Sequence, residues 1–385
     1  MKTVGVICEY NPFHNGHAKQ LRAIDGVRVC LMSGNFVQRG EPALLSKAVR
    51  AQAAVLGGAD LVLELPLTYA VASAEGFAQG GVDVLTRMGC IDALCFGSES
   101  GELDDIMSTA ELLLTEHFQT ALRSELASGV SFPRARQNAV EALGGRGSVL
   151  EQPNDILAVE YCKAILRLRS PLRPMTVRRE GSYHESLERE NPSASMLRTM
   201  ERWNGYVPQA ALEAYAGAPR HTVQAGERAW LALLRAMPEA AFEALPYGSE
   251  GLWRKVMHAC RAEATLDAVI EAAKSKRYTH TRLKRLLLCA LLGLSVQTME
   301  RPAPYVRVLA LNERGAAVVR EARKRGSIPV LNAGQSALDA DYAELERRAD
   351  ALYGLFCEGA PEKPVPDSRV FVRKTDACEP PHDTL

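Results

Sequence analysis

Net charge, long apolar runs and a leader pattern are all missing from this sequence, and each absence excludes a class of protein. The 385 residues carry 46 basic and 46 acidic side chains, and 47% of them are hydrophobic. A disordered chain has few apolar residues and a large net charge, and a protein that coats nucleic acid by bulk charge is basic. Because no run of about 18 apolar residues occurs, no transmembrane helix is expected. The first residues reach Glu9 and Asn11 too soon for a signal peptide, so none is expected.

Paired cysteine motifs are missing as well. The number of cysteines, nine, is odd, and no two of them form a CxxC pair. Most lie singly inside apolar runs such as RVCLM and LLLCALL. We therefore predict small buried thiols in a reducing cytoplasm, with neither a disulfide framework nor a cysteine metal site.

Charge is segregated along the chain, although its total is zero. Residues 58–116 contain eleven acids and one base, whereas residues 251–325 contain sixteen bases and six acids. An acidic flank on one domain and an anion-binding face on another would give this pattern. Ordinary solvated helix surfaces explain it equally well until a motif decides between the two.

Short apolar runs alternate with helical patterns in the first 100 residues, which indicates βαβ units and a parallel sheet. Strands are predicted at 3–10, 27–34, 59–66 and 90–99, with helices at 17–24, 44–58 and 73–89. The rest is mostly helical in pattern, with a helix from 193 and short strands at 175–180, 305–312 and 327–332. The prediction is an α/β fold, with a domain boundary near residue 200 and a mostly α-helical second half.

The segment EYNPFHNGH follows the first predicted strand directly. His14 and His17 are three residues apart at the start of a helix, where free backbone N–H groups and the helix dipole favour an anion. Gly16 leaves room for a phosphate to approach, and an imidazole can donate to a phosphoryl oxygen. There are two weaker interpretations: a surface turn that carries two histidines by chance, and a metal site with two histidine ligands. The position of HNGH after a first strand indicates a nucleotide site.

This motif resembles that of the HxGH superfamily of nucleotidylyltransferases, which bind ATP on a Rossmann-like parallel sheet. Further segments of the superfamily type occur in the expected order: MSGNFVQRGEPALLSK, GADLVLELP, FGSE, NDILAVEY, SYH at 182–184, SASMLR, THTRLKRLLL and YVRVLALNERG. Over nearly its whole length the chain is similar to the tRNA(Met) cytidine acetate ligase family. The resemblance implies a cytoplasmic ligase that activates acetate with ATP as acetyl-adenylate. It then acetylates N4 of the wobble cytidine, position 34, of elongator tRNA(Met), with no membrane or DNA partner.

The resemblance also implies two domains and a set of site residues. Residues 1–200 would form the ATP-binding catalytic domain, and residues 201–385 a mostly helical tRNA-binding domain. His14, His17 and Arg198 are the implied catalytic residues. The implied ATP-binding residues are Ile7, Cys8, Glu9, Tyr10, Asn11, Pro12, Phe13, His14, Asn15, Gly16, His17, Ala18, Lys19, Gln20, Gly97, Asn154, Arg178, Arg179, Ser193 and Ser195.

Some of these assignments leave alternatives open. Either Arg178 or Arg179 is the ATP contact, because RREGSYH aligns with an uncertainty of one position. Asn154 is equally well explained as the N-cap of its helix, and SxS is also a common N-cap. No dedicated carboxylate cage is apparent, so Mg²⁺, if it is used, is expected to be carried by ATP.

Polar residues after the second strand form a further candidate group. Asn35, Gln38, Arg39 and Lys47 follow the end of a strand that faces the ligand crevice in a doubly wound sheet. They could help to hold acetate, pyrophosphate or tRNA. For Lys47 and Arg50, the solvated face of a helix is the alternative interpretation.

The segment KSKRYTHTRLKR (274–285) has the composition expected of an RNA-binding surface, with six bases, no acid, and Tyr278 and His280 between them. Lys and Arg contact phosphates, and Tyr or His can stack on an unpaired base. The candidate RNA-binding residues are Lys274, Lys276, Arg277, Arg282 and Arg285. Arg282 and Arg285 are expected to share a helix face. Taken alone, the segment is explained equally well as a solvated helix.

Two other functions compete with a tRNA ligase. A small-molecule adenylyltransferase of the same superfamily would need no basic helical half and is usually about half as long. The other is a non-enzymatic RNA-binding protein with a degenerate nucleotide-binding fold. The intact HNGH and SASMLR segments argue against this second alternative.

Overall fold

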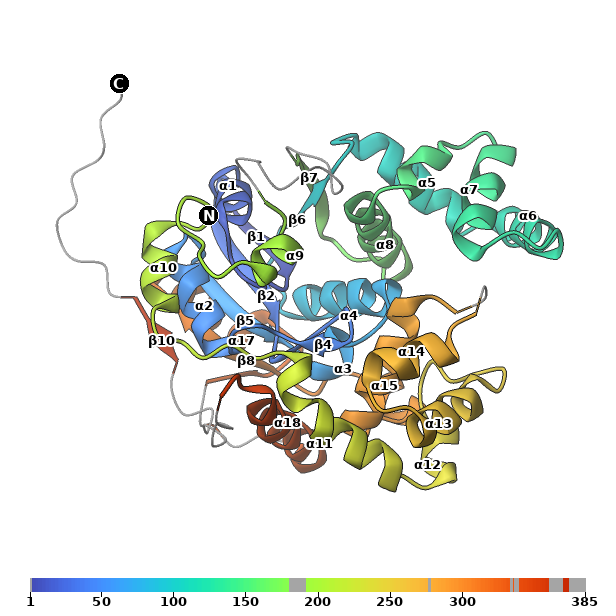
Figure 1. The fold of residues 1–385 in the computed structure, drawn as a ribbon. Helices are drawn as coiled ribbons and strands as arrows, with labels where there is room; N and C mark the ends of the chain where they lie inside the picture. Colours follow the sequence, from blue (N-terminus) through green and yellow to red (C-terminus); the bar gives the residue numbers. More distant parts are fainter. Residues whose placement is uncertain are drawn as a thin grey trace.

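One sheet organises the molecule in a computed structural model that describes residues 2–179, 192–275, 278–332, 335, 339–359 and 370–373. Its strand order is β10-β8-β5-β2-β1-β6-β7, and β9 pairs with β8 (Figure 1). A separate short hairpin joins β3 and β4. The strands are β1 Thr3–Cys8, β2 Val27–Ser33, β3 Phe36–Val37, β4 Glu41–Pro42, β5 Leu61–Leu65, β6 Ala93–Ser98, β7 Arg173–Arg178, β8 Val306–Leu311, β9 Val330–Leu331 and β10 Phe371–Val372.

The strands β1, β2, β5, β6 and β7 run parallel, as the alternating sequence pattern predicted. Helices cover both faces of this part of the sheet, which explains why its strands are nearly continuous apolar runs. On one face, side chains such as Leu31 and Leu63 pack with Phe77 of α4 (Ala74–Arg87). On the other, Val6 and Met32 pack with α1 (Asn15–Arg22) and α2 (Lys47–Leu56). The α/β fold class is confirmed.

The second half of the chain returns to this sheet. β8 pairs with β5 in the antiparallel sense, so the sheet is mixed and is not purely parallel. The predicted strands at 305–312 and 327–332 are confirmed as β8 and β9, whereas β10 was not predicted. An unpaired edge of β5 would expose a row of backbone N–H and C=O groups, and β8 satisfies them. The sheet therefore crosses the boundary expected near residue 200, although the assignment of one function to each half stays a prediction.

Two groups of helices extend from the sheet (Figure 1). The helices between β6 and β7 are α5 Leu103–Leu113, α6 Glu116–Ala127, α7 Phe132–Ala142, η1 Gly147–Leu150 and α8 Pro153–Arg167. After β7 come α9 Ala194–Thr199, α10 Gln209–Tyr215, α11 Val223–Ala236, α12 Glu239–Glu243, α13 Leu252–Ala262, α14 Leu266–Ala273, α15 His280–Leu292, α16 Val296–Glu300, α17 Glu313–Arg325, α18 Ala340–Tyr353 and η2 Gly354–Phe356, while α3 Leu67–Ala70 lies between β5 and α4. Helices α11 to α15 share a core of their own around Trp230, Leu283 and Leu287. This core supports the mostly helical character predicted for the second half.

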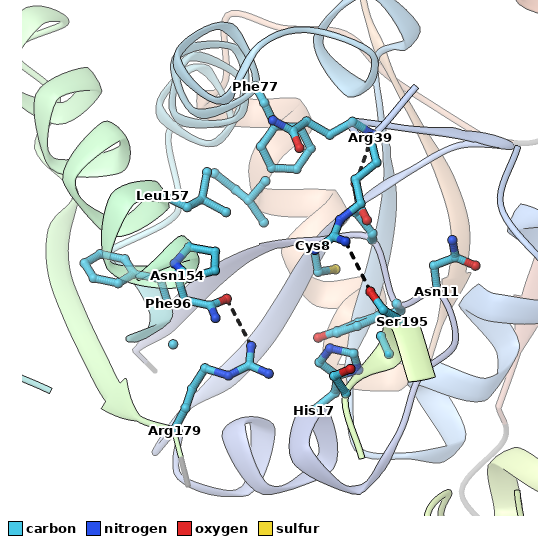
Figure 2. Close-up of a pocket in the computed structure, with 18 of the residues that line it drawn as sticks. Cys8, Asn11, His17, Arg39, Phe77, Phe96, Asn154, Leu157, Arg179 and Ser195 are labelled. Atoms are coloured by element: carbon cyan, nitrogen blue, oxygen red, sulfur yellow. Dashed lines mark hydrogen bonds between the residues drawn. The ribbon is translucent and has the colours of Figure 1, made fainter. Parts of the chain in front are cut away.

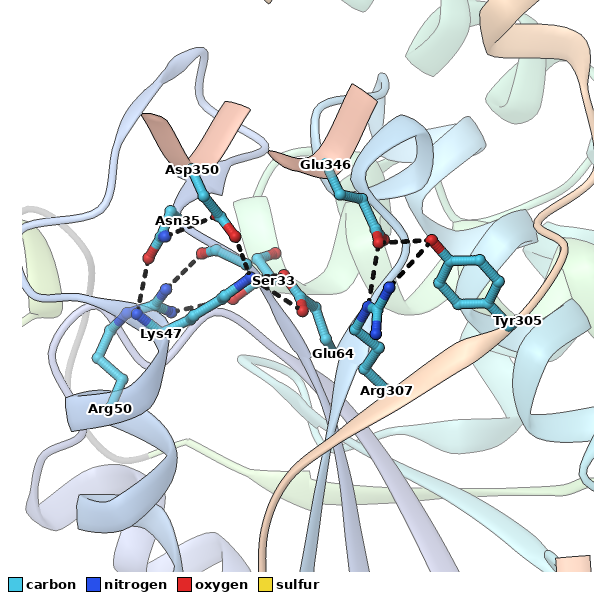
Figure 3. A network of polar contacts seen from close by, with 10 residues as sticks. Ser33, Asn35, Lys47, Arg50, Glu64, Tyr305, Arg307, Glu346 and Asp350 are labelled. Carbon is cyan, nitrogen blue, oxygen red and sulfur yellow. Dashed lines mark hydrogen bonds and ion pairs between the residues drawn. The ribbon is translucent and has the colours of Figure 1, made fainter. Parts of the chain in front are cut away.

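A buried polar network joins α18 to the start of α2 (Figure 3). Lys47 Nζ lies 3.1 Å from Glu64 Oε1 and 2.7 Å from Asp350 Oδ2, and Asn35 Nδ2 donates to the other Asp350 oxygen at 2.9 Å. Arg50 is fully buried and donates to the backbone carbonyls of Glu9, Ser33, Gly34 and Leu45. The interpretation of Lys47 and Arg50 as a solvated helix face is therefore wrong. Both cations are buried, Lys47 between two carboxylates and Arg50 among backbone carbonyls.

The eight described cysteines are all free, and six of them are buried; Cys378 lies outside the described residues. Burial raises the pKa of the Cys95 thiol to about 11 and that of Cys162 to about 12. In the part of the chain that the structure describes, no helix has the length and apolar character needed to cross a membrane.

Candidate active site

The side chains of the two histidines of HNGH cap the first turn of α1. Gly16 N donates to His14 Nδ1 at 3.0 Å, and His14 N donates to His17 Nδ1 at 3.3 Å, an arrangement that caps the helix reciprocally. The two rings lie 3.8 Å apart between centroids. Because each Nδ1 accepts a hydrogen bond, the proton of each neutral ring is on Nε2. His14 Nε2 is buried and has no hydrogen-bond partner among the described residues. The first turn of α1 therefore presents an unsatisfied donor to its surroundings.

These rings line a cavity of about 280 Å³ at the carboxyl ends of β1 and β6 (Figure 2). Eight of the fourteen residues from 7 to 20 line it, and the other six do not. The lining residues are Ile7, Cys8, Glu9, Tyr10, Asn11, His14, His17 and Gln20. Among the rest, Phe13 and Ala18 are core residues, and Asn15 donates from Nδ2 to Gly205 O. Pro12, Gly16 and Lys19 do not line the cavity either.

Gly97, Asn154 and Arg179 line the cavity, and Figure 2 shows Asn154 and Arg179 next to each other. Arg179 Nη1 donates to Asn154 Oδ1 at 3.1 Å, and a Cβ on Gly97 would lie 3.2 Å from Arg179 Cγ. Asn154 is the second residue of α8, and its Nδ2 donates to Glu99 Oε1 at 2.6 Å. The N-cap interpretation of Asn154 is therefore wrong, because Glu99 accepts from the first N–H groups of that helix. Arg178 does not line the cavity.

Ser193, Ser195 and Arg198 also line the cavity, and Figure 2 shows Ser195 on the side away from Asn154. Ser193 caps α9 by accepting from Met196 N at 3.3 Å. Ser195 Oγ accepts from Arg39 Nη1 at 3.1 Å and from Arg198 Nη2 at 3.3 Å. Arg198 Nη1 also donates to Asn11 O at 3.1 Å. Two guanidinium groups thus converge on one hydroxyl in the lining of the cavity that His14 also lines, as a site for a polyanion requires.

The apolar wall of the cavity was not predicted. Phe77, Phe96, Leu157 and Tyr161 line it together, and the rings of Phe96 and Tyr161 lie 5.7 Å apart. In the sequence, Phe77 and Leu157 have the spacing of ordinary core residues of α4 and α8. Only Phe96, which stands beside Gly97 in the FGSE segment, could have been predicted to line a nucleotide site. The cavity combines apolar and aromatic surface with converging cationic and N–H groups, which is the usual composition of a nucleotide pocket.

The pKa values of Glu9, His14 and His17 are shifted from their ordinary values. Burial, aided by the nearby positive charge of Arg179, lowers the pKa of His14 to about 3. Burial first, and then His14 and Arg179, lowers the pKa of His17. Burial raises the pKa of Glu9 against the opposing effect of Arg39. Both imidazoles are therefore neutral hydrogen-bond donors at pH 7.

The ligand-free protein is expected to lose stability as the pH falls below about 6.5, the ordinary histidine pKa. In that range the unfolded chain binds protons at His14 and His17 that the folded protein does not, so the unfolding free energy falls by up to about 1.4 kcal/mol per pH unit for each histidine. Above the ordinary pKa both states are neutral and this contribution is constant. Urea unfolding between pH 7 and 5 measures the slope. A slope that is unchanged in His14→Gln would contradict the assignment.

The described residues of the basic segment make contacts with other residues of this chain. Arg282 Nε donates to Tyr247 O at 3.0 Å, and the guanidinium of Arg285 lies 5.4 Å from the centre of the Tyr247 ring. The two arginines share a face of α15, as expected, but that face is half-buried and is not a solvated surface. Burial also lowers the pKa of Arg285. Lys274 is exposed and pairs with Glu271, and Lys276 and Arg277 lie outside the described residues, as does the SYH segment.

The chain is similar to known proteins over nearly its whole length. A model of the family described as HIGH Nucleotidyl Transferase matches residues 1–365. The tRNA(Met) cytidine acetate ligase of Clostridium tetani is 35% identical, over 92% of this chain and 96% of the relative. The enzyme of the same name from Clostridium acetobutylicum is 33% identical over the same shares. The crystal structure of Thermotoga maritima TmcAL bound with alpha-thio ATP superposes with a TM-score of 0.87 at 28% identity, over 97% of this chain and all of that one.

Proposed function

The chain belongs to the tRNA(Met) cytidine acetate ligase family, and we propose that it uses ATP to join acetate to N4 of cytidine 34 of elongator tRNA(Met). The protein is a ligase, and the cavity at His14 is proposed as its ATP site. The single observation that carries this proposal is the buried Nε2–H of His14, which has no partner among the described residues and belongs to the same cavity lining as two converging arginines. A buried donor without an acceptor is costly, and a phosphate oxygen would satisfy it.

In the first half-reaction, an acetate oxygen attacks the α-phosphorus of ATP. A phosphorus–oxygen bond to acetate forms, the bond to the β-phosphate oxygen breaks, and pyrophosphate leaves. His14 and His17 donate from Nε2 to phosphate oxygens, and Arg198 and Arg39 attract the departing pyrophosphate. These residues position the reactants and stabilise developing charge, which are the main contributions in transfers at phosphorus.

In the second half-reaction, the N4 amine of the cytidine attacks the carbonyl carbon of acetyl-adenylate. A carbon–nitrogen bond forms, the bond between the acetyl carbon and the AMP oxygen breaks, and the nitrogen releases one proton to solvent. The acceptor base must leave its anticodon stack to reach the adenylate. Residues after 200, including Lys274, Lys276, Arg277, Arg282 and Arg285, are proposed to carry the tRNA.

Mg²⁺ is proposed to arrive with ATP. Among the described residues, no group of three or more histidine, cysteine or acidic side chains could hold a metal ion. Among the acidic residues that the structure describes, Glu9 alone lines the cavity, and its raised pKa opposes a negative charge there. The phosphates themselves would therefore be the main ligands, and the metal would neutralise part of their charge.

Incubation with total tRNA, ATP and labelled acetate tests the proposal. The label is expected in one nucleoside, N4-acetylcytidine, in the anticodon loop of elongator tRNA(Met), with AMP and pyrophosphate released in equal amounts. Adenylyl transfer to a small molecule instead, or RNA binding without turnover, would favour one of the competing functions. Acetate-dependent ATP–pyrophosphate exchange follows the first half-reaction separately.

Neighbouring arginines give a matched pair of variants for the ATP site. Arg179→Ala is expected to raise the KM for ATP by about 10–100-fold, because a hydrogen bond to a charged group contributes about 1.5–3 kcal/mol. Arg178→Ala should leave it nearly unchanged, since Arg178 does not line the cavity. Steady-state exchange at varied ATP measures both. Equal effects in the two variants would remove Arg179 from the site.

A further inference from the structure

A second cavity lies on the far side of Arg198. Its volume is about 190 Å³, and it is bounded by the β3–β4 hairpin and by α11, α14 and α15. Arg198 lines both this cavity and the cavity at His14, so the two share one side chain as a wall. The helices that bound the second cavity come from the half of the chain that holds the basic segment.

The walls of the second cavity are apolar with a charged edge. Leu44, Trp230 and Leu287 are buried side chains in its lining, and Trp230 is held in place by donating from Nε1 to Leu287 O at 3.2 Å. At the edge shared with the first cavity lie Glu41 and Lys284. Apolar walls with a few polar groups at one edge suit a flat heteroaromatic ring that must be oriented.

Glu41 connects the two cavities electrostatically. Its Oε1 lies 3.4 Å from Arg198 Nη2, and its Oε2 lies 3.4 Å from Lys284 Nζ. A carboxylate accepts a hydrogen bond from the exocyclic amine of cytosine but repels the carbonyl oxygen that uracil has at the same position. Lys284, which pairs with Glu41 in the absence of RNA, could also contact a backbone phosphate of the same nucleotide.

We propose that this second cavity receives the unstacked pyrimidine base of the acceptor nucleotide, with Glu41 accepting from its exocyclic amine at the boundary with the ATP cavity. The inference rests on the proposed function, because it names where the RNA substrate of that reaction binds. Acetate is too small and too polar to require this space and must in any case lie at the α-phosphate. The arrangement places a base-sized cavity next to the arginine that also faces the nucleotide.

A variant at the rim tests the proposal without changing the ATP cavity. Gln224 is exposed and lines the second cavity only, so Gln224→Trp is expected to close its mouth. Acetate transfer to tRNA should fall by about 10–100-fold in kcat, because the acceptor amine is no longer held in position beside the adenylate. Acetate-dependent exchange without RNA should be unchanged. The tRNA Kd should also change little, because phosphate contacts carry most of the affinity.

Ala229→Trp is the matched control, since Ala229 is exposed on the same helix and does not line the cavity. Its exchange and transfer should equal those of the wild type, and thermal melting checks that both variants fold. Normal transfer by Gln224→Trp, or an equal loss in both variants, would overturn the assignment of the cavity. If the wild type itself transfers no acetate to RNA, the proposed function fails instead, and the two failures are thereby distinguished.

Discussion

Replacing His17 by alanine is expected to lower acetate-dependent ATP–pyrophosphate exchange by about 10²–10³-fold in kcat, as removal of one preorganised donor does elsewhere. The side chain lines the nucleotide cavity, and its Nδ1 already accepts from His14 N, which leaves Nε2–H for the phosphates. Packing against Tyr10, at 4.8 Å between ring centroids, fixes the direction of that donor. Because the donor acts on charge that develops during the reaction, KM for ATP should change less than kcat.

The control must separate catalysis from helix capping. His17 is the third residue of α1, where glutamine can also accept from the N-cap backbone N–H. His17→Gln is therefore expected to keep the stability of the wild type and to lose exchange almost as completely as His17→Ala. Exchange that survives in His17→Gln would show that the ring serves the helix and not the nucleotide.

Replacing Arg50 by methionine is expected to lower the unfolding free energy by at least about 3 kcal/mol, since removal of a buried hydrogen-bonded charge leaves several carbonyls unsatisfied. The guanidinium donates to four backbone carbonyls and is fully buried. Arg22→Met is the matched control, because Arg22 is exposed on α1 and its loss should cost less than about 0.5 kcal/mol. Urea unfolding measures both variants.

A second readout follows from the position of these carbonyls. One belongs to Glu9, in the segment that lines the nucleotide cavity, and two belong to Ser33 and Gly34 at the end of β2. Loss of Arg50 should therefore weaken ATP binding even under conditions where the variant is folded. An Arg50→Met protein with normal stability and normal KM for ATP would mean that the surrounding chain re-pairs those carbonyls.

The parallel part of the fold and the histidine site were predictable because their signals are local. Each central strand is a short apolar run, and HNGH combines its donors within four residues. The contacts that the sequence did not predict are those between residues far apart in the chain. Asn35 and Asp350 are separated by 315 positions, and no local pattern announces that α18 will pair with Lys47.

The sequence left the choice between Arg178 and Arg179 open for a different physical reason. Neighbouring residues in a strand point to opposite faces, so an uncertainty of one position reverses the direction of each side chain. β7 ends at Arg178, and of these two neighbours only Arg179 lines the cavity, where it contacts Asn154. The cavity between the hairpin and α15 likewise depends on Glu41 and Lys284, 243 positions apart, and is not foreseeable from composition.

The antiparallel pairing of β8 with β5 has a consequence for synthesis of the chain on the ribosome. When residue 200 has been made, β5 has an open edge and Lys47 lacks the carboxylate of Asp350. An open edge and an underpaired buried charge both favour association with other chains. The nascent first half is therefore expected to remain dependent on chaperones until residue 350 emerges, and translation arrested in between would release an aggregation-prone fragment.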